Sequence, residues 1–186
     1  HFISDLKINH KTVEKEIPIF QIPSSDNFHL LRTLLNLIFA SKYNNMSSAV
    51  AQLSPTGLWA NFNNLNAVPR GSKKEDRVIQ FMKDFGTRLG LETFEDEIRN
   101  VIIRKPATPG MENKQAIILQ SHLDMVHQKN NDVNFDFDSQ GIQMIIDGDW
   151  VRAKGTTLGA DNGIGVATIM AILESSNIAH PAIEAL

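Results

Sequence analysis

Apolar residues recur at helical spacing in two segments of the first half of the chain. The first segment follows Ser54-Pro55, a favourable N-cap and first-turn pair, and it carries Leu58, Trp59, Phe62 and Leu65. The second lies between a predicted capping box, Ser72–Glu75, and a helix-terminating glycine, Gly90. Its apolar face comprises Val78, Ile79, Met82, Phe85 and Leu89. Both patterns predict amphipathic helices.

Shorter apolar runs in the rest of the chain predict strands. They lie at 91–94, 101–104, 116–121, 142–146, 150–154 and from 182 onward. Ala116–Ser121 is almost wholly apolar and is predicted to be buried on both faces. Asp147-Gly148-Asp149 predicts a hairpin turn between two of the strands. Ile164–Leu173 is apolar all round and predicts a buried helix, so alternating strands and helices indicate a layered α/β domain.

Residues 1–46 differ in composition from the rest and divide the chain into two regions, 1–46 and 47–186. They are rich in Asn, Lys, Ile and Phe, and they predict one short helix after Asp26. The apolar face of that helix comprises Phe28, Leu31, Leu34, Leu35 and Ile38. Met46-Ser47-Ser48 resembles an ordinary protein start. Two interpretations stay open: an extension upstream of the true initiator, or a genuine N-terminal arm.

Composition narrows the classes of partner. The 186 residues carry a net charge of −3 and contain no Lys/Arg-rich run, so no nucleic-acid partner is expected. No segment reaches the roughly 18 uninterrupted apolar residues of a membrane span, so no membrane partner is expected either. Cysteine is absent, which rules out disulfides and thiolate metal ligands in this sequence and fits a cytoplasmic location.

The strongest candidate chemistry is a His-x-Asp at the end of an apolar strand. His122 and Asp124 are two residues apart, so on an extended backbone their side chains share a face. Ligands of α/β sheets collect at the carboxyl ends of strands, where this motif lies. Asp161 adds a carboxylate within a glycine-rich loop ahead of the buried helix. Taken separately, His122 is more typical of a hydrogen-bonded structural histidine than of a metal ligand, and Asp161 fits a helix N-cap at least as well as a metal ligand.

Other titratable residues are weaker candidates. His127 lies in a polar loop and is expected to be solvent-exposed, and His180 precedes Pro181 and reads as a turn residue. Asp132, Asp136 and Asp138 form an acidic cluster without EF-hand spacing, which predicts a solvated loop.

Three motifs carry a resemblance to a known family. They read RKPATPGME at 104–112, SHLDMV at 121–126 and KGTTLGADNGIG at 154–165. From Leu53 to Leu186 the sequence resembles the bacterial aminoacyl-histidine dipeptidases, within the co-catalytic zinc peptidase family that includes aminoacylases and carnosinases. The resemblance implies a three-layer α/β zinc-exopeptidase-like domain with a mostly parallel central sheet, present here only as its N-terminal part, residues 47–186.

The resemblance also implies roles for the three candidate residues. His122 would ligate one Zn²⁺, Asp124 would act in catalysis by holding and polarising that imidazole, and Asp161 would bridge two metals through a loop with a cis Asp161–Asn162 peptide. Since His and carboxylate ligands suit several ions, Co²⁺ and Mn²⁺ stay open.

The implied reaction is hydrolysis of dipeptides, with Xaa-His as the expected substrate, by water activated between two metals. The family's Glu-Glu pair, which supplies the general base and a further ligand, does not occur in these 186 residues, and Glu184 is not assigned to it. We therefore expect this chain to be an inactive portion of an enzyme that is a homodimer at full length. A non-catalytic binding or assembly module on the same fold and an aminoacylase-like hydrolase are the alternatives.

Overall fold

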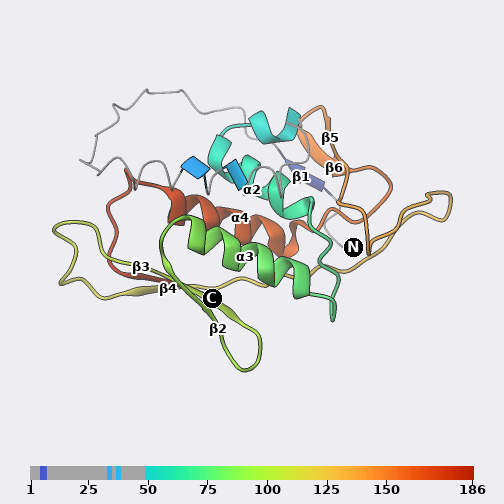
Figure 1. Cartoon of the computed structure of the whole chain (residues 1–186). Helices are drawn as coiled ribbons and strands as arrows, with labels where there is room; N and C mark the ends of the chain where they lie inside the picture. The colour runs from blue at the N-terminus through green and yellow to red at the C-terminus, as the bar shows by residue number, and fades with distance from the viewer. Residues whose placement is uncertain (1–4, 8–32, 35–36, 39–48) are drawn as a thin grey trace.

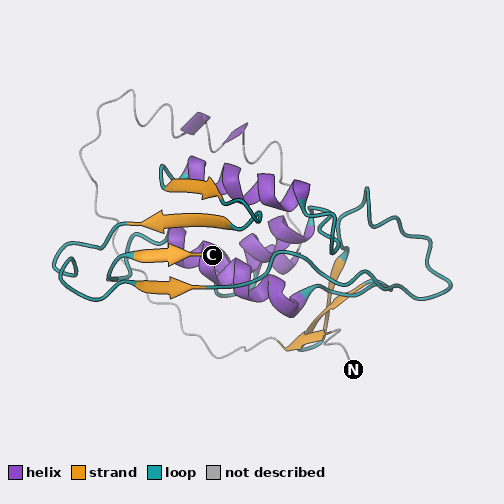
Figure 2. Ribbon diagram, turned by 90° about the horizontal axis from the view of Figure 1, so that it is seen from below, coloured by secondary structure: helices purple, strands orange, loops and turns teal. Residues whose placement is uncertain are grey.

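Figure 1 shows a computed structural model of the chain, which describes residues 5–7, 33–34, 37–38 and 49–186. Two helices lie on one face of a four-stranded sheet, and a smaller three-stranded sheet lies at one end of the molecule (Figures 1 and 2). No helix among the described residues is long and apolar enough to cross a membrane.

Both predicted helices of the first half are present, with different starts. After the short 3₁₀ helix η1 (Ala49–Gln52), α2 spans Thr56–Asn66 and buries Trp59, Phe62 and Leu65. The prediction that Ser54 caps α2 is wrong. Pro55, with an extended backbone, occupies the N-cap position, and no side chain caps the helix, which starts at Thr56.

The second helix, α3, spans Asp76–Arg88 and has Leu89 as its C-cap, and the next residue, Gly90, has a φ of +70° that matches the predicted helix stop. The predicted capping box is wrong. The hydroxyl of Ser72 donates to Asp124 Oδ2 at 2.5 Å, and Glu75 Oε1 accepts from the backbone N–H of Lys73 at 2.6 Å. The serine is therefore used in a contact 52 positions away rather than at its own helix.

The four-stranded sheet is mixed. Its strands are β2 (Glu92–Glu95), β3 (Val101–Lys105), β7 (Ile183–Ala185) and β4 (Ile117–Leu119), in that spatial order. The pairs β2–β3 and β3–β7 are antiparallel, and β4–β7 is parallel. The predicted α/β class is confirmed, but a mostly parallel, three-layer arrangement is not confirmed for the described strands, because one of their three pairings is parallel.

β4 lies at the edge of this sheet, and the prediction that it is buried on both faces is wrong. Ile118 is 67% exposed, because helices cover only the other face. In the same row across the sheet, Glu184 accepts a hydrogen bond from Arg104 at 2.7 Å. Such ion pairs favour solvent contact on this face.

The smaller sheet has the order β1-β6-β5, all antiparallel, from β1 (Asp5–Lys7), β6 (Trp150–Ala153) and β5 (Met144–Asp147). Its β5–β6 hairpin confirms the predicted turn, with Gly148 at φ +57°. β1 shows that the segment 1–46 contributes a strand. Within the helix predicted after Asp26, Leu34 and Ile38 are helical and about half exposed, and the rest of its predicted apolar face lies outside the described residues.

Helix α4 (Ala160–Glu174) joins two hydrophobic cores and confirms the predicted buried helix. Val166, Met170 and Leu173 pack with α3, β3 and β7. Ala167 packs with the core formed by Trp59 and Phe62 of α2. The start of α4 is thereby fixed next to the end of β4, where the candidate residues lie.

Candidate active site

The loop after β4 carries His122 and Asp124 and is pinned to the segment before α3. Met125 forms a parallel β-bridge with Gly71, and its N–H donates to the carbonyl of Arg70 at 2.9 Å. Since β4 and β7 are parallel, this loop lies at the carboxyl ends of two parallel strands. That is the position the sequence predicted for His122.

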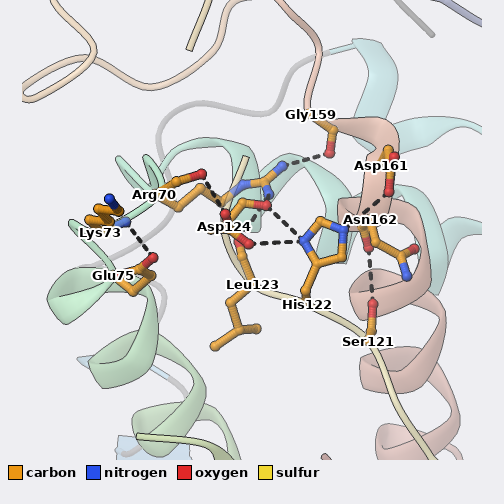
Figure 3. A network of polar contacts seen from close by, with 11 residues as sticks. Arg70, Lys73, Glu75, Ser121, His122, Leu123, Asp124, Gly159, Asp161 and Asn162 are labelled. Atoms are coloured by element: carbon orange, nitrogen blue, oxygen red, sulfur yellow. Dashed lines mark hydrogen bonds and ion pairs between the residues drawn. The ribbon is translucent and has the colours of Figure 1, made fainter. Parts of the chain in front are cut away.

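The structure brings the three predicted residues together around one imidazole ring (Figure 3). His122 Nδ1 lies 3.0 Å from Asp124 Oδ1, and His122 Nε2 lies 3.1 Å from Asp161 Oδ1, across 39 positions of sequence. The side chains are partly open to solvent, at 49% exposed for His122, 33% for Asp124 and 78% for Asp161. A ligand from solvent can therefore reach the ring.

The start of α4 leaves the Asp161 carboxylate available. Gly159 adopts a left-handed conformation with φ +70°, and Asp161 and Asn162 have non-helical backbone angles around the cis peptide that the resemblance implied. Asn162 Oδ1 accepts the N–H of Gly165 at 3.2 Å, as an N-cap does. The N-cap interpretation of Asp161 is therefore wrong, because its neighbour takes that role and its own carboxylate faces His122.

The negative charge of Asp124 favours the tautomer of the His122 ring that carries its proton on Nδ1. Partial burial acts to raise the pKa of Asp124, but hydrogen bonds from Ser72 and His122 together lower it below its ordinary value. An ionised Asp124 accepts a hydrogen bond from Nδ1–H, which leaves the Nε2 lone pair directed at Asp161. Two electron-pair donors, a ring nitrogen and a carboxylate oxygen, then face one another, and this arrangement fits a metal cation or a proton between them.

Arg70 is the site residue that sequence reasoning missed. Its side chain is 1% exposed and bonds to carbonyls on both site loops, at Leu123 and Gly159. Burial lowers the pKa of Arg70 to about 10, against the opposing effect of the Asp124 carboxylate. In the sequence, Arg70 stands between Pro69 and Gly71 in a predicted chain break, where no periodicity indicates burial.

The other candidate residues stay away from this site. His127 is half-buried and stacks on Phe137 with ring centroids 4.2 Å apart, so its expected exposure is wrong. His180 is buried, and its backbone bonds to Thr108, rather than standing in an open turn. Asp136 and Asp138 are exposed, and Asp138 pairs with Lys74 at 2.6 Å, which confirms the solvated loop.

Within the described part of the chain, no group of three or more His, Asp or Glu side chains is placed to hold a metal ion. His122 Nε2 and Asp161 Oδ1 are the two electron-pair donors that face one another here, and Asp124 contacts the ring of His122. A cavity of about 410 Å³ adjoins the site and would admit a small molecule. Its lining includes His122, Asp124, Ile79, Met82, Val166 and Ile169.

Comparison with known proteins gives a consistent picture. No protein-family model matches the sequence. The chain is 46% identical over 139 residues to the cytosol non-specific dipeptidase of Escherichia coli (strain K12), covering 75% of this chain and 29% of that protein. The crystal structure of aminoacylhistidine dipeptidase from Vibrio alginolyticus superposes with a TM-score of 0.73 and 49% identity, covering 74% of this chain and 28% of that one.

Two further solved structures share the fold more distantly. The aminopeptidase PepT from Bacillus cereus is 27% identical with a TM-score of 0.54. A tripeptidase from Staphylococcus aureus is 22% identical with a TM-score of 0.55, which supports the fold alone. The chain spans less than a third of the length of the two dipeptidases. The resemblance is confirmed: this α/β chain is related in sequence and fold to the N-terminal portion of the cytosol non-specific and aminoacyl-histidine dipeptidases.

Proposed function

We propose that this chain supplies part of the metal site of a metallodipeptidase. The observation that carries the proposal is the convergence of two segments, 39 positions apart, on one imidazole. Asp124 holds Nδ1 of His122 and Asp161 faces Nε2, as in the carboxylate–histidine–metal arrangement of metalloenzymes. The names of the dipeptidase relatives support the same reaction class.

The residues present fit a divalent cation, with Zn²⁺ as the first choice and Co²⁺ or Mn²⁺ as alternatives. His122 Nε2 and Asp161 would hold it, and Asp124 would orient the ring and increase its basicity. When bound, metal ions of this kind would activate a water for attack and polarise a peptide carbonyl. Asp124 is thus the residue of this chain that takes part in catalysis without ligating.

We propose dipeptides as the substrate class, with Xaa-His preferred, and a cytoplasmic, homodimeric full-length enzyme. The relatives' names, one a cytosol non-specific dipeptidase and one an aminoacylhistidine dipeptidase, support the substrate class and the location, whereas the homodimer follows from the family resemblance alone. The acidic net charge and the small cavity beside His122 suit a small-molecule substrate rather than a nucleic acid. The two ligands and the absence of a general-base Glu-Glu pair predict that the 186 residues alone bind metal weakly and do not turn over substrate.

Paramagnetic Mn²⁺ tests this function because it reports weak binding. When Mn²⁺ is titrated into the chain, we expect the backbone amide NMR signals of His122, Asp161 and Asn162 to broaden first. His122→Gln and Asp161→Asn should each abolish that selectivity, since each removes one of two ligands. His127→Gln is the matched control and should leave it unchanged.

Two results would contradict the proposal. One is broadening centred elsewhere, such as on the acidic loop at 132–138. The other is broadening around His122 that survives both ligand substitutions. Hydrolysis of an Xaa-His dipeptide by the 186 residues with Zn²⁺ would overturn the narrower expectation that this portion is inactive.

A further inference from the structure

Arg70 lies buried between the two loops that carry the candidate ligands. Its Nη1 donates to the carbonyl of Leu123 at 3.0 Å and, at 3.4 Å, to that of Asp124. Its Nη2 donates to the carbonyl of Gly159 at 2.7 Å and to Asn66 Oδ1 at 2.8 Å. One planar group therefore holds the backbone on both sides of the site, next to His122 on one loop and two residues before Asp161 on the other (Figure 3).

The chemistry of this position suits a guanidinium and no other side chain. A guanidinium presents donors on two nitrogens in a rigid plane, whereas a lysine has a single ammonium on a flexible stem. Burying a charge is costly unless hydrogen bonds and an opposite charge compensate, and here three carbonyls, an amide oxygen and the nearby Asp124 carboxylate do so. The burial of Arg70 is therefore tied to the placement of these groups.

Two glycines of the Asp161 loop leave room for this group. A Cβ atom on Gly159 would lie 2.4 Å from Arg70 Nη2, and one on Gly163 would lie 2.7 Å from it. Neither distance is compatible with a methyl group beside the guanidinium. Gly159 and Gly163 thus allow the backbone of this loop to approach Arg70 closely.

We propose that Arg70 is a positioning residue for the candidate active site. Its guanidinium fixes the backbone at Leu123 and Gly159 and thereby sets the separation of His122 Nε2 from the Asp161 carboxylate. The inference deepens the proposed function, and its importance rests on that function. The geometry itself exists without metal, so it is tested on the metal-free chain.

A matched control separates positioning from general stabilisation. Arg88 is also largely buried, at 15% exposed, and its Nη2 donates to Glu174 Oε1 at 2.5 Å. Glu174 ends α4, whereas Asp161 lies at its start. Removing Arg88 should therefore weaken the fold without disturbing the site.

The experiment compares Arg70→Lys, Arg70→Met and Arg88→Met by NMR. We expect both Arg70 variants to shift the ring ¹⁵N signals of His122 and to speed amide exchange at Met125 and Gly163 by about tenfold relative to the α3 core, which corresponds to the loss of about one hydrogen bond. Arg88→Met should lower the unfolding temperature and leave these signals in place. Lysine should behave like methionine, because one ammonium does not reach both loops.

Unchanged His122 signals in a folded Arg70 variant, or equal changes in the Arg88 variant, would overturn the proposal. If both Arg70 variants fail to fold, the wild-type chain decides: Arg70 Nη protons should show through-space contacts to Leu123 and Gly159, and their absence would refute it. Failure of Mn²⁺ binding would contradict the proposed function while leaving this result intact, and the converse also holds.

Discussion

The core beneath α3 and the candidate site at the end of β4 differ in what holds them. Phe81, Phe85 and Met170 are fully buried and belong to one hydrophobic cluster. His122 and Asp161 are 49% and 78% exposed, yet their loops are tied together by the buried Arg70. The core is thus stabilised through its side chains and the site through its backbone. This difference lets reactive groups stay open to solvent while keeping a fixed geometry.

The largest expected effect is in the core. Phe81→Ala removes a fully buried ring and should lower the free energy of unfolding by about 3–5 kcal/mol. Asp161→Asn changes an exposed side chain and should alter it by no more than about 0.5 kcal/mol. Urea unfolding of both variants measures the contrast. A large loss for Asp161→Asn would show that the site side chains themselves carry stability, contrary to the comparison.

A substitution in the backbone of the site loop should have an intermediate effect. Gly159 and Gly90 share a φ of +70°, but a Cβ atom on Gly159 meets Arg70 Nη2 and one on Gly90 meets nothing within 4 Å. Gly90→Ala should therefore cost about 1 kcal/mol for its conformation alone. Gly159→Ala should cost about 2–4 kcal/mol because overpacking is added. Equal losses in urea unfolding would mean that the Arg70 contact does not constrain the loop.

The same contrast explains what the sequence could predict. Helices α2 and α3 follow from apolar spacing and α4 from a run that is apolar all round, and Gly90 and Gly148 mark a helix end and a hairpin turn by chemistry that acts locally. The prediction of a capping box was wrong because the hydroxyl of Ser72 instead donates a hydrogen bond to Asp124, a partner 52 positions away. The prediction that β4 is buried on both faces was wrong because a run of apolar residues does not show whether a second layer covers the strand.

In the candidate site, too, local patterns predicted some of the contacts and not others. His122 and Asp124 were paired by the period of an extended strand, and the structure confirms their contact. Asp161 was linked to them by family resemblance, since no local rule joins residues 39 positions apart. No sequence pattern indicated that Arg70 is buried, because a polar residue between Pro69 and Gly71 is typical of an exposed turn. Long-range polar contacts were therefore the part that pattern reasoning could not reach.

The smallest expected effect concerns the partly buried ring of His127, which lies next to the segment that carries Arg70. His127 lies over Gly71, where a Cβ atom would come within 2.3 Å of its ring. Partial burial lowers the pKa of His127, and Asp138 opposes that shift. Because the folded pKa is lower than the unfolded value of about 6.5, the neutral ring is favoured in the fold. Its stability contribution is complete above pH 6.5 and is lost as the pH falls through the folded pKa.

We therefore expect unfolding midpoints in urea to fall more steeply between pH 7.5 and pH 5 for the wild-type chain than for His127→Phe. Phenylalanine can keep the stack on Phe137, at 4.2 Å in the native structure, but does not titrate. His127→Gln should also flatten the pH dependence while losing the stack, so it should be less stable than His127→Phe at pH 7.5. Parallel slopes for wild type and His127→Phe would show that the ring is as well solvated in the fold as in the unfolded chain. The difference in slope thus measures how far the ring of His127 is closed to water, while the side chains of His122 and Asp161 stay open to it.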